Sequence, residues 1–321
     1  MTRGHKAVRR LITVAPWLFG IILLLAACTQ TSRDDGYAFL TRYRSDWQQP
    51  GAGKVEAEPL FHAVPSLTPA STVTPTVTAT NSAHPRVFID PGHGGVDTGT
   101  IGTTNDGTEV EEKNIALALA LQTAEDLRQA GVEVVLSRTN DSLPGSVPAD
   151  YTDNGTVLTP DGVLADLQRR IDRANASGAQ VLLSIHLNAY SDPSVGGTQT
   201  FYDGARPFSD QSKRFATLVQ QNVVDALRAD GFNFPDRGAT DDQDLQAESL
   251  GALNENYNHI VLLGPAVPGR LRPSQMPGAL CETLFLSDPA EATAVVRPGV
   301  QKVIAAAFAK AVEQFLQTSN Q

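Results

Sequence analysis

The chain contains 321 residues and carries a formal net charge of −10, from 35 acidic and 25 basic side chains. Four of the basic residues lie within residues 1–27, so loss of that segment would move the net charge to −14. A protein this acidic is not expected to bind nucleic acid or an anionic membrane through charge. The composition therefore argues against a nucleic-acid partner.

Residues 1–27 are predicted to be an export signal. A basic segment that ends in Arg9 and Arg10 precedes an apolar run over 11–25. This run is short for a membrane span, which needs roughly 20 residues, although an uncleaved anchor is the alternative. The sequence LAAC at 25–28 resembles the lipobox of bacterial lipoproteins. That resemblance implies an acylated Cys28 and an extracytoplasmic protein, in the periplasm or on the outer face of the envelope, held to the membrane by lipid.

Two further segments are expected before the folded region. Residues 28–47 form the lipidated N-terminal segment, and residues 48–85 are rich in Pro and Thr without hydrophobic periodicity. Such a composition cannot bury enough apolar surface to offset its conformational entropy. We therefore expect a disordered linker over 48–85, with a contour length on the order of 100 Å.

Residues 86–321 are long enough for one well-buried domain. Short apolar segments alternate with longer segments of helical periodicity. The strands are expected at 87–89, 132–136, 181–185, 198–202, 260–263 and 279–283, and the helices at 113–130, 164–176, 208–229 and 300–316. This alternation predicts a single α/β domain with a mostly parallel, twisted sheet covered by helices on both faces.

Two histidines end predicted strands. His93 lies in the glycine-rich turn after 87–89, and His186 follows the strand at 181–185. Ligand sites in α/β sheets gather where strands end, so the two imidazoles can converge on one point. For either histidine alone, the ordinary alternative is a hydrogen-bonded side chain at the edge of the sheet with no metal-binding role. Together they indicate a metal site.

A catalytic zinc needs a third protein ligand and one open position. The acids that precede the first helix are candidates, although acids at a helix start ordinarily compensate the helix dipole. These acids are Glu109, Glu111 and Glu112. His259 is a rival ligand, but it lies in a polar loop where an exposed side chain is expected. The pattern alone does not choose among the four.

Glu282 lies in the otherwise apolar strand at 279–283. A buried carboxylate is costly unless it is paired or ligating. Its ion-pair candidates are Arg237, Arg270 and Arg272. Otherwise Glu282 could accept the proton of a metal-activated water. The adjacent Cys281 is expected to be a buried structural thiol, since no basic neighbour would lower its pKa. If Cys28 is lipidated, Cys281 has no disulfide partner.

Four sequence blocks resemble, in order and spacing, the zinc-dependent N-acetylmuramoyl-L-alanine amidases of the amidase type 3 family. They are IDPGHGG at 89–95 with Asp97 and Gly99, EKN at 112–114, SIHLNA at 184–189, and ETLFLSDP at 282–289 with Glu291 and Ala292. The resemblance covers 86 to about 317. It implies a zinc-hydrolase-like fold, with His93, Glu112 and His186 as Zn²⁺ ligands and Glu282 as the catalytic glutamate.

The implied reaction is hydrolysis of the peptidoglycan amide bond between N-acetylmuramic acid and L-alanine by a zinc-bound water. A monomer is expected, and the resemblance leaves room for an activator protein. The alternatives are a zinc-dependent peptidase or carboxypeptidase acting on wall peptides, or a wall-binding lipoprotein without turnover.

Two polar insertions, at 140–162 and 236–258, depart from the family pattern. We expect both to be surface loops that a stable core tolerates, although either could form a lid over the cleft or contact an activator. The blocking helix of the Gram-negative division enzymes should be absent, because 190–202 passes quickly into the next strand.

Overall fold

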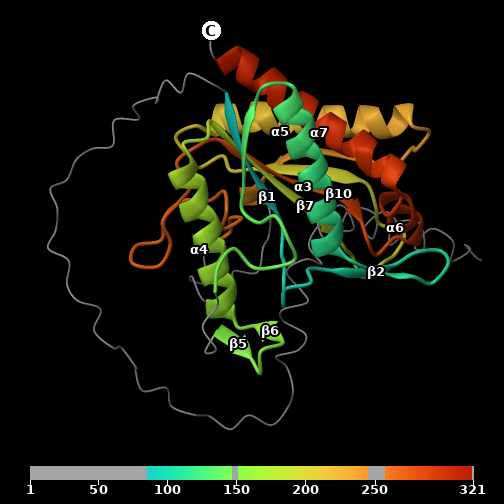
Figure 1. Cartoon of the computed structure of the whole chain (residues 1–321), viewed down its shortest axis with the longest axis horizontal. Coiled ribbons are helices and arrows are strands. Elements are labelled where there is room, and N and C mark those ends of the chain that lie inside the picture. The colour runs from blue at the N-terminus through green and yellow to red at the C-terminus, as the bar shows by residue number, and fades with distance from the viewer. Residues whose placement is uncertain (1–84, 147–150, 245–256, 320–321) are drawn as a thin grey trace, which may run out of the picture. The chain divides into compact units, whose positions relative to one another are not determined.

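The computed structural model describes residues 85–146, 151–244 and 257–319 (Figure 1). The predicted export signal, the lipidated segment with Cys28 and almost all of the predicted linker lie outside the described residues. Parts of both predicted insertions also lie outside them. Within the described ranges, no helix combines the length and the apolar character that a membrane crossing requires.

A six-stranded sheet in the order β4-β1-β7-β10-β8-β9 forms the centre of the domain. Its strands are β1 (Arg86–Pro91), β4 (Glu133–Leu136), β7 (Val181–Asn188), β8 (Thr198–Tyr202), β9 (Asp236–Asp241) and β10 (Gly278–Phe285). The strands β4, β1, β7 and β10 are parallel. The pair β8 and β9 is parallel within itself and antiparallel to β10. The carboxyl ends of β1, β7 and β10 therefore share one edge of the sheet.

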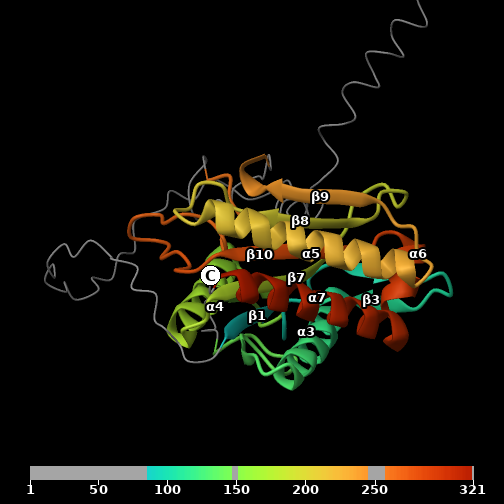
Figure 2. The same ribbon diagram turned by 90° about the horizontal axis from the view of Figure 1, so that it is seen from above.

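Helices cover both faces of this sheet, as predicted. Figure 2 shows α3 (Glu112–Gln129), α5 (Ser209–Ala229) and α7 (Pro298–Ser319) side by side on one face. The helix α4 (Pro160–Ser177) packs on the other face. Side-chain alternation along the strands separates the two cores. On β7, Leu183 packs with α3, α5 and α7, whereas Leu182 packs with α4.

Local sequence explains where α4 begins and ends. Thr159 precedes the helix with its side chain accepting a hydrogen bond from the Gly162 backbone N–H, and Pro160 occupies the first turn, where its missing N–H costs nothing. Gly178 ends the helix in the left-handed conformation, with φ 67°. The helix therefore begins four residues before the start that hydrophobic periodicity predicts.

One predicted strand is wrong. Residues 260–263 form a turn in which the N–H groups of Leu263 and Gly264 donate to the Ile260 carbonyl. The run is apolar because Val261 and Leu262 are buried in the core beside α4. Burial beneath a sheet face gives a short segment the same composition as a buried strand.

Several short elements were not predicted. The hairpin of β2 (Ile101–Thr103) and β3 (Glu109–Glu111) precedes α3, and a 3₁₀ turn η2 (Asp242–Asp244) follows β9. The helix α6 (Pro289–Val295) follows β10. The hairpin of β5 (Thr152–Asp153) and β6 (Val157–Leu158) lies in the first predicted insertion, and β9 lies in the second.

Candidate active site

The pairing of β7 with β10 places two of the predicted site residues side by side. His186 and Glu282 are partners in the parallel register. Because side chains alternate along a strand, both project to the face that carries Leu182 and Leu280. They lie near the carboxyl ends of their strands, and both are buried. This is the sheet edge where the sequence predicts a ligand site.

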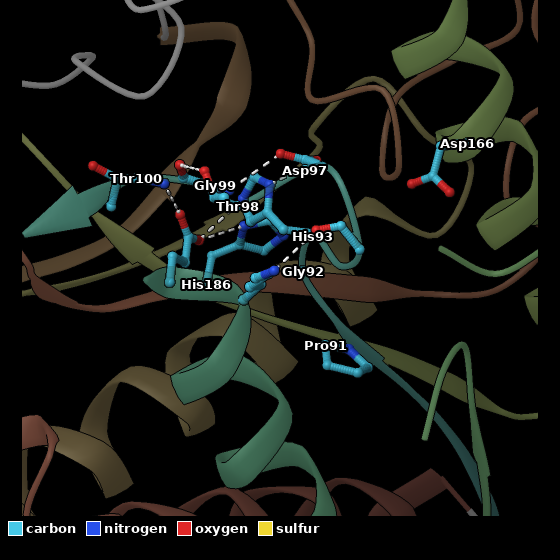
Figure 3. A network of polar contacts seen from close by, with 12 residues as sticks. Pro91, Gly92, His93, Asp97, Thr98, Gly99, Thr100, Asp166 and His186 are labelled. Atoms are coloured by element: carbon cyan, nitrogen blue, oxygen red, sulfur yellow. Dashed lines mark hydrogen bonds and ion pairs between the residues drawn. The ribbon is translucent and has the colours of Figure 1, made fainter. Parts of the chain in front are cut away.

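His93, Glu112 and His186 converge at this edge, where one ligand atom of each lies within 4.8 Å of the others. Glu112 Oε1 is 3.2 Å from His93 Nε2 and 3.0 Å from His186 Nδ1. The two imidazole rings meet edge to face, with centroids 4.9 Å apart (Figure 3). These three side chains thus offer two nitrogen donors and one oxygen donor to a single point.

The structure distinguishes among the four candidates for the third position. Glu112 is the first residue of α3, and its side chain is completely buried at the histidines. Glu109 is exposed, and Glu111 bonds to Asn114 on the helix surface. His259 is elsewhere in the fold, beside two aspartates.

Backbone groups fix the Glu112 carboxylate. Its Oε1 accepts a hydrogen bond of 2.9 Å from the Leu187 N–H, and its Oε2 accepts one of 2.9 Å from the Thr100 N–H. Burial opposes ionisation, but His93 and His186 hold the pKa of Glu112 below its usual value. The carboxylate is therefore kept charged and held in place by two different segments.

A second carboxylate orients His93. Asp97 Oδ2 lies 2.8 Å from His93 Nδ1, which leaves Nε2 directed at Glu112. Burial opposes protonation, yet Asp97 and Glu112 raise the pKa of His93 well above its usual value. The field at the ring thus favours positive charge, and the same field favours a bound cation. A carboxylate behind a ligating histidine is the arrangement found in zinc sites.

Glycines let the backbone approach the three side chains closely. A Cβ on Gly92 would lie 2.3 Å from His186 Cε1. A Cβ on Gly99 would lie 2.5 Å from Glu112 Oε2 and 2.6 Å from His93 Cδ2. His93 itself has φ 59°, an uncommon conformation for a residue with a side chain. Gly92 and Gly99 are therefore required by the space that His186, Glu112 and His93 occupy.

We expect Gly99→Ala to lower zinc affinity by about 10- to 100-fold, because the new methyl group must displace Glu112 or His93. The matched control is Gly107→Ala. Gly107 also has a positive φ, of 87°, but its Cβ would meet nothing within 4 Å. Zinc competition with a chelator measures the affinity. Equal losses in both variants would mean that backbone strain, and not contact with the ligands, causes the effect.

Arg170 of α4 stabilises the turn that carries His93. Its guanidinium is fully buried and donates to the carbonyl oxygens of Pro91 (2.9 Å) and His93 (2.7 Å). It also pairs with Asp90 at 2.8 Å and with Asp166 at 2.6 Å. One side chain therefore ties the end of β1 to α4.

Replacing Arg170 by methionine should lower the free energy of unfolding by about 3 to 5 kcal/mol, since Asp90 and Asp166 would remain buried without their partner. Arg173→Met is the control, because Arg173 is exposed on the same helix. Denaturant unfolding of both variants measures the difference. A loss below about 1 kcal/mol would contradict the buried ion-pair network.

Glu282 lies beside the three converging residues. It is 3% exposed, and its Oε2 has no hydrogen-bond partner among the described residues. Burial and the charge of Glu112 raise its pKa well above the usual value, against the opposing effect of His93. Two of its predicted ion-pair partners are engaged elsewhere. Arg270 pairs with Asp161, and Arg272 pairs with Asp172. The ion-pair alternative therefore has no support from these two arginines.

Glu291 of α6 is a buried residue to which the sequence assigned no role. Its Oε1 accepts from the Gly197 N–H and its Oε2 from the Phe285 N–H, both at 2.6 Å. Burial raises its pKa to about 7. Glu291 thereby joins the segment before β8 to the end of the strand that carries Glu282. An acid in the first turn of a helix ordinarily suggests only a dipole effect, so the pattern gave no sign of this role.

Three other expectations can be compared with the fold. Cys281 is buried, as expected, and burial raises the pKa of its thiol to about 12, which disfavours the thiolate that a nucleophile needs. No helix occurs in residues 189–197, between β7 and β8, so the predicted absence of a blocking helix is confirmed there. The expectation of an exposed His259 is wrong. Its side chain is 16% exposed and faces Asp203 and Asp242.

Comparison with known proteins identifies the family. The family described as N-acetylmuramoyl-L-alanine amidase matches residues 87–314. The amidase AmiC of Neisseria meningitidis is 28% identical over 253 residues, which cover 74% of this chain and 54% of AmiC. The chain thus spans about half the length of that relative.

Two solved structures share the fold. An N-acetylmuramoyl-L-alanine amidase from Clostridium difficile has 29% identity and a TM-score of 0.52, covering 74% of this chain and 99% of that one. The CwlD amidase from Clostridioides difficile, solved in complex with the GerS lipoprotein, has 25% identity and a TM-score of 0.54, covering 73% and 100%. The extent of the family match shows that this chain belongs to the N-acetylmuramoyl-L-alanine amidase family.

Proposed function

We propose that this protein hydrolyses the amide bond between N-acetylmuramic acid and L-alanine in peptidoglycan, with Zn²⁺ held by His93, Glu112 and His186. The observation that carries the proposal is the convergence of these three side chains beside Glu282, a buried carboxylate with one oxygen free of hydrogen bonds among the described residues. Family membership supports the reaction.

The donor set fits zinc. Catalytic zinc sites use three protein ligands of nitrogen and oxygen type at about 2.0–2.2 Å, which places tetrahedral ligand atoms roughly 3.3 Å apart. The separations of 3.2 and 3.0 Å around Glu112 Oε1 are close to that value. Zinc, when bound, polarises the scissile carbonyl and lowers the pKa of a coordinated water towards about 7.

The other groups of the site transfer the proton and position the zinc-binding side chains. Glu282 accepts the proton of the attacking water and later delivers it to the nitrogen of the departing L-alanine. Burial and the charge of Glu112 raise its pKa, so this environment favours uptake of a proton by Glu282. Asp97 keeps the His93 ring in one orientation, and the Thr100 and Leu187 N–H groups keep the Glu112 carboxylate in place.

The reaction products test this function. The full chain is incubated with purified peptidoglycan, and the new termini are identified by mass spectrometry. An amidase releases intact stem peptides with a free N-terminal L-alanine. New termini at D-alanine or at the diamino acid would indicate a wall peptidase instead. Binding to the wall without any new terminus would indicate a binding protein.

Membrane attachment belongs to the same proposal. Export would remove residues 1–27, and acylation of Cys28 would anchor the chain outside the cytoplasm, with 48–85 as the connection to the domain. The CwlD amidase was solved in complex with a lipoprotein, and this supports a protein partner, such as an activator, for this chain. Mass spectrometry of the mature N-terminus, compared with a Cys28→Ser variant, tests the anchor directly.

A further inference from the structure

Asp203, Asp242 and His259 meet at a second point in the domain. Asp203 directly follows β8, and Asp242 directly follows β9. Since β8 and β9 run antiparallel to β10, their carboxyl ends lie at the edge opposite to that of Glu282 (Figure 2). The cluster is therefore separate from the candidate active site.

The three side chains are close enough together to hold one metal ion. One ligand atom of each residue lies within 4.8 Å of the others. His259 Nδ1 is 3.0 Å from Asp203 Oδ2 and 3.3 Å from Asp242 Oδ1. These separations match those of atoms that share a cation at about 2.0–2.2 Å, and they repeat the spacing in the candidate active site. Both aspartates are buried, and His259 is partly exposed.

Each aspartate presents one oxygen to the backbone and the other to the cluster. Asp203 Oδ1 accepts from the Ala205 N–H, and Asp242 Oδ2 accepts from the Ile260 N–H. Asp203 Oδ2 is buried without a hydrogen-bond partner among the described residues, because its approach to His259 Nδ1 lacks hydrogen-bond geometry. A single ring nitrogen carries at most one hydrogen, so it cannot satisfy two carboxylates.

The nearby Arg206 guanidinium does not donate a hydrogen bond to Asp203 Oδ2. Arg206 donates to the carbonyl oxygens of Leu263, Gly264 and Ser274 and to the Ser274 hydroxyl. Asp241 adds a further acid next to the cluster, bonded to the Gly204 N–H. Two buried carboxylates that face each other cannot both stay ionised without a compensating cation, and in its absence a proton must remain on the pair.

We propose that Asp203, Asp242 and His259 bind a second divalent cation of the zinc type. One imidazole and two carboxylates suit Zn²⁺, whereas Ca²⁺ takes six to eight oxygen ligands. The cation would join the ends of β8 and β9 to the turn at 260–263, which covers the sheet beside α4. The site is structural and is independent of the proposed amidase activity.

Metal counting tests this site. The full chain is freed of metal with a chelator, dialysed against Zn²⁺, and analysed for metal and protein. We expect Asp203→Asn/Asp242→Asn to bind one equivalent fewer than the wild type. His93→Ala/His186→Ala should also lose one, and the combination of all four changes should lose two. Each asparagine can still accept its backbone N–H, so the fold should persist. His259→Ala removes the partly exposed ligand and should give the same loss as the double asparagine variant.

The matched control is Asp241→Asn, which removes the same charge one residue from Asp242 without touching the ligand set. It should bind as much zinc as the wild type. Equal zinc counts in the wild type and in both the double asparagine variant and His259→Ala would overturn the proposal.

Thermal unfolding gives a second measurement that needs no activity. In the His93→Ala/His186→Ala background, zinc at about 100 times its dissociation constant should raise Tm by about 5 to 10 °C. Adding Asp203→Asn/Asp242→Asn should abolish the increase. A zinc-independent Tm in the His93→Ala/His186→Ala background would contradict the second site, whatever the products of wall digestion.

Discussion

Replacing Glu282 by glutamine is expected to reduce kcat by about 10²- to 10⁴-fold, the range typical of a lost general base. Glutamine has nearly the same shape but cannot accept the proton of water. Because Glu282 lies beside the three converging residues and is not one of them, zinc content should remain unchanged. Release of stem peptides from peptidoglycan measures kcat, and elemental analysis measures zinc. In the wild type, activity should also fall as pH drops through the pKa of Glu282.

Glu109→Gln is the control for this experiment, since Glu109 is an exposed acid three residues before Glu112 and its replacement should leave activity unchanged. Retained activity in Glu282→Gln would remove the assignment of the base. Loss of zinc from this variant would instead mean that Glu282 takes part in metal binding.

Replacing Glu112 by glutamine should release the metal and lower kcat/KM by about 10³- to 10⁴-fold, because the several kcal/mol that zinc supplies to the reaction would be lost. Both Glu112 oxygens accept backbone N–H groups, so the amide of glutamine would place an NH₂ against one of them. That unsatisfied donor should also cost about 1 to 3 kcal/mol of stability. Zinc analysis, kinetics and denaturant unfolding measure the three effects.

Glu111→Gln is the matched control, because Glu111 ends β3 one residue earlier and accepts a hydrogen bond from the exposed Asn114 side chain. It should keep its zinc and its activity. If Glu111→Gln lost zinc and Glu112→Gln kept it, the third ligand would have been assigned to the wrong acid.

The parallel core of the fold could be predicted because β7 and its neighbours are buried apolar runs separated by amphipathic helices. The same pattern placed His93 and His186 at strand ends. It could not select Glu112 over Glu109 and Glu111, because all three are acids near a helix start. Only the orientation of the first turn of α3, which turns Glu112 inward, separates them. The family resemblance supplied that choice from the sequence.

Other features left no signal in the sequence pattern. The edge strand β9 is polar and half-buried, so it lacks the apolar alternation that marks a strand. Residues 260–263 were wrongly predicted as a strand because a buried turn can be as apolar as a strand. The roles of Arg170 and Glu291 depend on backbone groups of distant segments, and periodicity carries no information about such bonds.

The two backbone N–H groups that hold Glu112 also bear on how the proposed zinc site would respond to chelation. The Thr100 and Leu187 N–H groups bind the carboxylate through the backbone, so this hold on Glu112 does not require a metal. Chelation followed by resupply should then be reversible without unfolding.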